Sequence, residues 1–114
     1  KRVAELQQIA RAIQLADTDP ATAFTGCATA DADIDTCTLP TGLANFQDPS
    51  TPGTPCTGAS TGTCQYSVSQ ADGDAAATTQ DWQVCSYLES GSGSLATGLV
   101  SVSSSNATPH TGCN

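Results

Sequence analysis

The chain has 114 residues, of which 38% are apolar, so we expect one domain with a modest core. Eleven Asp and Glu oppose three Lys and Arg, which gives a formal net charge of −8 at pH 7. The Lys and Arg residues are Lys1, Arg2 and Arg11, so residues 12–114 contain Asp and Glu but no Lys or Arg. This charge disfavours binding to nucleic acid and to anionic lipid surfaces, because both depend on cationic contacts.

Residues 1–17 are predicted to form an amphipathic helix. The apolar positions recur every three or four residues and are Val3, Leu6, Ile9 and Ile13. Most other positions are Ala, Gln, Glu and Arg, which favour helices, and Pro20 marks the end. We expect the apolar stripe to pack on a sheet.

The start of this helix lacks the residues that usually begin one. No Ser, Thr, Asp or Asn precedes it, and Lys1 and Arg2 stand at the positive end of the helix dipole. We therefore expect the helix to continue upstream of Lys1 in the native protein.

Residues 18–62 are predicted to be an irregular surface region, since prolines and glycines are frequent there. From residue 63 the pattern alternates with a period of two, which predicts an antiparallel sheet of about three to four strands over residues 63–103. Residues 104–114 are predicted to be an irregular tail. A helix on one face of this sheet gives an α+β fold in two layers.

The run 81–89 is the clearest strand. Trp82, Val84 and Leu88 share one face of it, and we expect this face to meet the apolar stripe of the helix. Cys85 and Tyr87 share the opposite face.

An even number of cysteines in a small chain rich in Ser and Thr indicates three disulfides formed in an oxidising compartment. The cysteines are Cys27, Cys37, Cys56, Cys64, Cys85 and Cys113. Six cysteines allow 15 pairings, and the sequence alone does not choose among them.

Two stretches resemble type IV pilins and the pseudopilins of type II secretion systems. Residues 2–15 (RVAELQQIARAIQL) resemble the second half of the long N-terminal helix of that family. Residues 82–91 (WQVCSYLESG), with 64–69 (CQYSVS) before them, are similar to the sheet region of bacterial pilin-like proteins. In this family the first half of the helix is an apolar segment that sits in the inner membrane before assembly and in the filament core afterwards.

The resemblance implies a structural subunit of an extracellular, type IV pilus-like filament that acts by polymerisation and adhesion. It further implies a homo-oligomer in the full-length form, a monomer for this fragment, a cell-surface location, no cofactor and no enzymatic activity. Two alternatives stay open: a pseudopilin of a type II secretion system, and a secreted disulfide-rich binding or adhesin module. In the binding module, Trp82 and Tyr87 are expected on an exposed platform.

We expect the cysteines to pair with their nearest neighbours along the chain. The pairs are Cys27 with Cys37, Cys56 with Cys64, and Cys85 with Cys113. The third pair would tie the tail to a central strand, as the C-terminal disulfide loop does in many pilins.

Two acidic runs are candidate calcium sites. Residues 70–82, with Asp72, Asp74 and Asp81, resemble the calcium-binding loop of major pseudopilins, although the paired glycines of that loop are missing. Asp31, Asp33 and Asp35 alternate as calcium ligands do, but the glycine and the closing glutamate of an EF-hand are absent. Solvated turn aspartates are the alternative interpretation of both runs.

Sequence support for catalysis is weak. His110 is the only histidine, and no nucleophile-elbow motif or phosphate-binding loop accompanies it. Asn106, Ala107 and Thr108 form an N-glycosylation sequon, a short motif that also arises by chance.

Overall fold

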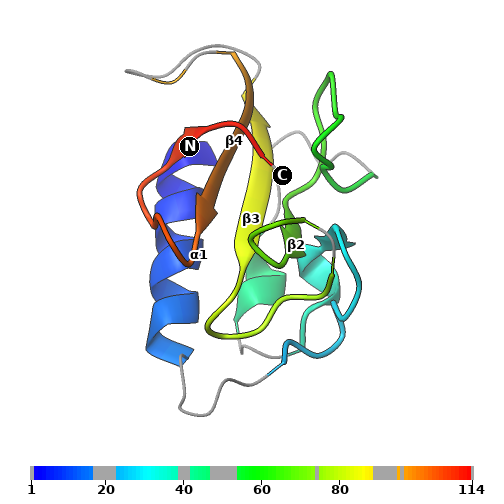
Figure 1. Ribbon diagram of the computed structural model, residues 1–114, viewed down its shortest axis with the longest axis vertical. Helices are drawn as coiled ribbons and strands as arrows, with labels where there is room; N and C mark the ends of the chain where they lie inside the picture. Colours follow the sequence, from blue (N-terminus) through cyan, green and yellow to red (C-terminus); the bar gives the residue numbers. More distant parts are fainter. Residues whose placement is uncertain are drawn as a thin grey trace.

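The computed structural model describes residues 2–16, 23–38, 42–46, 54–73, 75–88, 95 and 97–113. One α-helix lies against one face of an antiparallel sheet (Figure 1), and the strand order follows the chain. The elements are α1 (Arg2–Ala16), β1 (Ala32–Asp33), the 3₁₀ helices η1 (Ile34–Thr36) and η2 (Leu43–Asn45), β2 (Ser67–Ser69), β3 (Gln83–Leu88), β4 (Gly98–Ser103) and β5 (His110–Thr111). This arrangement agrees with the α+β class that the sequence predicts.

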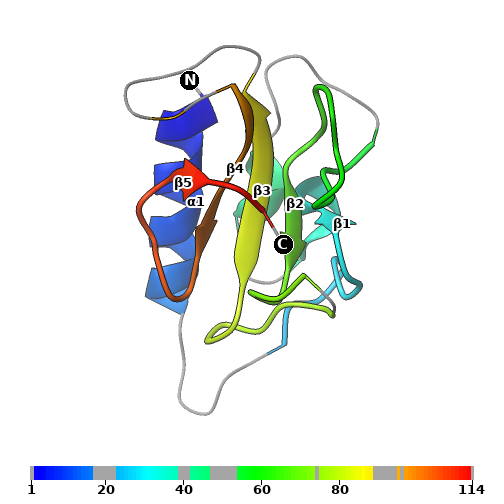
Figure 2. The ribbon, with the colours of Figure 1, turned by 45° about the horizontal axis from the view of Figure 1, so that its top comes forward.

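The predicted strand count of three to four is wrong, because the sheet has five strands. The two additional strands, β1 and β5, are only two residues long, too short to show an alternating pattern. They are defined by their hydrogen-bonded pairing with neighbouring strands: β1 pairs with β2, and β5 pairs with β4. They lie at the two edges of the sheet (Figure 2), inside the segments 18–62 and 104–114 that were expected to be irregular.

The helix buries its apolar stripe on the sheet. Leu6, Ile9 and Ile13 are fully buried, and Val3 is partly buried against the same core. The helix contacts β3 and β4, whose pairing runs from Gln83 opposite Ser103 to Leu88 opposite Gly98. Trp82, Val84 and Leu88 belong to the same core cluster, in agreement with the predicted face. The described part of the chain contains no helix long and apolar enough to cross a membrane.

The opposite face of the sheet carries a second, smaller apolar cluster. Cys56, Cys64 and Cys85 are buried there, and Tyr87, Leu99 and Cys113 pack against them. This cluster lies under the loop from Thr54 to Cys64 and the C-terminal tail. The sheet is therefore covered by a helix on one side and by a disulfide-rich layer on part of the other.

Replacing Ile9 with Ala removes a fully buried side chain from the contact between helix and sheet. We expect I9A to lower the free energy of unfolding by about 2–5 kcal/mol. L15A is the matched control, because Leu15 is 83% exposed on the same helix, and its effect is expected to stay within about 0.5 kcal/mol. Urea denaturation with the disulfides intact measures both, and equal effects would contradict this packing.

Candidate functional site

The helix α1 has a second face that points away from the sheet. Its exposed residues are Ala4, Gln7, Gln8, Arg11, Gln14 and Leu15. Leu15 is the one exposed large hydrophobic residue among those that the structure describes. Because this face combines small residues, neutral amides and one charge, it can approach a second helix with little desolvation of ions.

A partly buried hydrogen bond joins the helix to the residue that precedes β2. The hydroxyl of Tyr66 donates to the Oε1 atom of Glu5 at 2.9 Å, and the Tyr66 side chain is fully buried. Sequence analysis missed this contact, since the two residues are 61 positions apart. The sequence contains one indication that Tyr66 faces the core: the alternating pattern places Tyr66 and Val68 on the same face of the predicted strand.

The three disulfides join the pairs that we expected. Cys27–Cys37, Cys56–Cys64 and Cys85–Cys113 have Cα–Cα distances of 4.5, 4.9 and 5.9 Å, within the usual range. The described chain has no free cysteine. Three disulfides indicate maturation in an oxidising compartment.

The first disulfide depends on a glycine that sequence analysis did not single out. Gly26 has φ +82°, and a Cβ atom there would lie 2.1 Å from the carbonyl oxygen of Thr36. Any other residue at this position would combine a left-handed backbone with a clash. Gly26 therefore allows the two chain segments beside Cys27–Cys37 to come together.

Two of the aspartates predicted as calcium ligands make local hydrogen bonds. Asp33 caps η1, with its Oδ1 atom accepting from the amide of Asp35 at 3.0 Å. Asp81 accepts from the amide of Ala71 at 3.0 Å and so closes the 71–81 loop. Asp72 is exposed, and Asp74 lies outside the described residues. In the described ranges, no three His, Cys, Asp or Glu side chains gather where they could hold a metal.

His110 lies at the sheet edge, where it lines a shallow pocket of about 250 Å³. The other lining residues are Gln83, Ser101, Thr111, Gly112 and Cys113. The Nδ1 atom of His110 lies 2.9 Å from the carbonyl oxygen of Thr108, so this nitrogen is the donor. Its Nε2 atom lies 3.2 Å from the hydroxyl of Ser101.

This pairing of serine and histidine differs from a catalytic arrangement in two respects. Ser101 is 1% exposed, and its hydroxyl donates to the carbonyl of Gly112 at 2.7 Å. The imidazole is oriented by a backbone carbonyl rather than by a carboxylate, which orients the base in a Ser-His-Asp triad. The contacts hold β5 and the tail against β4.

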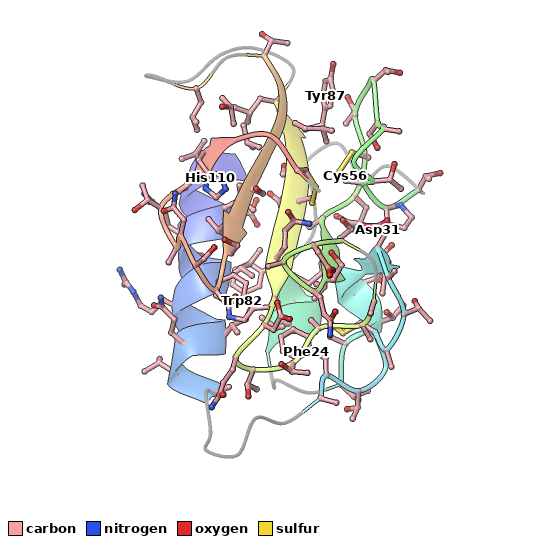
Figure 3. The ribbon with its side chains drawn as sticks, in the orientation of Figure 1. Phe24, Asp31, Cys56, Trp82, Tyr87 and His110 are labelled. Carbon is pink, nitrogen blue, oxygen red and sulfur yellow. A yellow bond between two sulfur atoms is a disulfide. The ribbon has the colours of Figure 1, made fainter. Side chains whose placement is uncertain are left out.

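The two aromatic residues of the expected binding platform lie in different environments. Trp82 is 2% exposed in the core between helix and sheet. Tyr87 is partly exposed on the other face, and its hydroxyl donates to the carbonyl of Thr61 at 2.9 Å. Figure 3 shows the two side chains far apart along the sheet. Trp82 therefore does not form an exposed platform with Tyr87.

Comparisons with models of known protein families, with curated proteins and with solved structures find no match to this chain.

The tail disulfide should stabilise the fold more than the loop disulfide. Cys85–Cys113 spans 28 positions and Cys56–Cys64 spans eight, and closing the longer loop removes more entropy from the unfolded chain. We expect the C85S/C113S variant to lose about 3.5 kcal/mol and the C56S/C64S variant about 2.5 kcal/mol. Urea titrations of both double variants test the order, and a reversed order would contradict it.

Asp33 should make stability depend on pH. Burial raises the pKa of its carboxyl above the ordinary 3.8, with a smaller contribution from neighbouring Asp35 and an opposing one from the Asp35 amide. A folded state with the higher pKa binds the proton more tightly, so stability falls as the pH rises from 3.8 through the folded-state value.

The D33N variant retains an oxygen acceptor for the Asp35 amide and removes the titration. Its stability relative to the unchanged chain should therefore increase between about pH 3 and pH 6. Urea denaturation at several pH values measures this difference. A difference that is constant or decreases over this range would contradict the assignment.

Proposed function

We propose that this chain is the pilin-like structural subunit of an extracellular filament, acting by polymerisation and surface contact. The observation that carries the proposal is the division of α1 into two faces. One face is buried on the sheet, whereas the other presents Ala4, Gln8, Arg11 and Leu15 to solvent. In a pilin-like filament, the stem helix packs on the globular part of its own subunit, the head, with one side. Its other side contacts the helices of neighbouring subunits.

The distribution of charge supports the same proposal. The Lys and Arg side chains of the sequence lie within residues 1–11 of the stem, and ten of the eleven Asp and Glu residues lie within residues 12–114. A subunit whose two parts differ in sign can place the stem of one copy beside the head of the next, as a head-to-tail polymer requires.

The disulfide-rich layer supports a role at a filament surface. Ala59 and Thr61 of its loop are exposed, the loop is closed by Cys56–Cys64, and the hydroxyl of Tyr87 in β3 donates to the carbonyl of Thr61. Loops held in this way can vary in sequence without loss of the sheet beneath them. In the proposed filament they determine which surfaces the polymer contacts. The full-length form would reach this location through the inner membrane.

Two other functions remain alternatives. A pseudopilin would share the fold, and a rise in melting temperature with Ca²⁺ that is lost with EDTA would favour it. A secreted adhesin would have to bind through residues other than Trp82, which is buried. A pseudopilin would share the exposed helix face, so we place the pilus subunit first because of the long surface loop and the additional cysteines.

The exposed helix face can be tested with one substitution and a matched control. L15D changes a residue that is 83% exposed, so the isolated chain should keep its stability within about 0.5 kcal/mol. In the full-length protein, the same change should lower the yield of sheared filaments at least about tenfold, because a carboxylate would be buried between helices. A59D, in the exposed loop of the disulfide-rich layer, introduces the same charge and should leave the yield unchanged.

Immunoblotting of sheared and cell-bound fractions with an antibody against this chain gives the yield. Recovery of L15D filaments at the level of the unchanged protein would contradict the proposed use of this face. If the unchanged protein is found only in the soluble fraction, the filament function itself is wrong.

A further inference from the structure

The turn between β4 and β5 presents the sequon of Asn106, Ala107 and Thr108 in an ordered conformation. The backbone amide of Ser103 donates to the carbonyl of Asn106 at 2.9 Å, and the amide of Asn106 donates back to Ser103 at 3.1 Å. The turn lies at the sheet edge beside α1 (Figure 2), and Ser104 lines a small pocket together with Gln14 of the helix. The position of the motif is thus fixed by the fold.

The three residues of the motif face in different directions. Ala107 is partly buried and packs against the main core, whereas Asn106 and Thr108 are both exposed. A residue in the centre of the motif that is anchored to the core keeps its two neighbours turned to solvent. Exposure of both is needed, because a glycosyltransferase reads the asparagine amide and the hydroxyl two residues later.

The reactive atoms of the motif are free. The Oδ1 atom of Asn106 accepts from the amide of Thr108 at 3.2 Å, which fixes which end of the carboxamide is nitrogen. The Nδ2 atom of Asn106 and the Oγ1 atom of Thr108 make no hydrogen bond with any residue that the structure describes. The nucleophilic nitrogen and the recognised hydroxyl are therefore available together, which a sequon arising by chance in a buried strand would not provide.

We propose that Asn106 is the acceptor of an N-linked glycan in the native protein. The donor class is an oligosaccharide attached to a lipid pyrophosphate. The Nδ2 atom forms a bond to C1 of the first sugar, the bond from C1 to the pyrophosphate oxygen breaks, and one amide proton is lost as the lipid pyrophosphate leaves. No oxidant or reductant takes part. The disulfides place the chain in a compartment where such a donor can meet it. The inference is independent of the filament proposal.

Peptide mapping of the protein from its source tests the site directly. Trypsin has no cleavage site between Ala12 and Asn114, because this stretch contains no Lys or Arg, but a glutamate-specific protease cleaves after Glu89 and, after reduction, releases a peptide that begins at Ser90 and contains the motif. We expect this peptide to carry one glycan that an N-glycosidase removes, converting Asn106 to Asp. An unmodified peptide, or sugar attached only to its Ser and Thr residues, would overturn the proposal.

Variants expressed in the same cells distinguish residues that the modification requires from neighbouring residues that it does not require. N106Q and T108V should abolish the modification, and T108S should retain it because the hydroxyl is preserved. P109A should be modified at least as fully as the unchanged chain, since Pro109 lies outside the motif and only restricts the backbone of Thr108. Near-UV circular dichroism checks that each variant is folded. A glycan that persists in folded N106Q would also overturn the assignment.

Discussion

The structure depends on the burial of one apolar helix stripe against the faces of β3 and β4. Leu6, Ile9 and Ile13 of the helix lose all solvent contact there, together with Val84 and Val100 of the sheet. Burial of each such side chain contributes on the order of 2 kcal/mol. A sheet with strands of two to six residues would have marginal stability without this cover. The partly buried hydrogen bond from Tyr66 to Glu5 adds a polar contact between the helix and the residue that precedes β2.

The other side of the sheet has no second helix in the described residues, and disulfides take its place. Two of the three bridges meet there, with Tyr87 and Leu99 as the main apolar side chains. A small domain with few large apolar residues gains stability from cross-links that restrict the unfolded chain. This solution leaves the covering loops free to carry polar residues at the surface.

The sequence predicted the elements that have a strong periodic signal of their own. The helix, the long strands and the face shared by Trp82, Val84 and Leu88 all follow from spacing. Other features could not be predicted from spacing, because each arises from segments that meet only in the fold. These are the strands β1 and β5, the requirement for Gly26 and the contact of His110 with Ser101. The backbone hydrogen bonds of Asp33 and Asp81 belong to the same group, because the partner amide of each is set by the local turn rather than by a periodic pattern.

The central claim is that α1 is the lower part of a longer stem in a filament subunit. Mass spectrometry of the mature N-terminus of the native, full-length protein from cell-surface material tests it most directly. If the filament proposal is right, the N-terminus lies some 25 residues upstream of Lys1, about the length of a membrane-spanning helix, with an unbroken apolar sequence and a methylated first residue. A conventional signal-peptide cleavage immediately before Lys1 would contradict the filament and favour a secreted binding module.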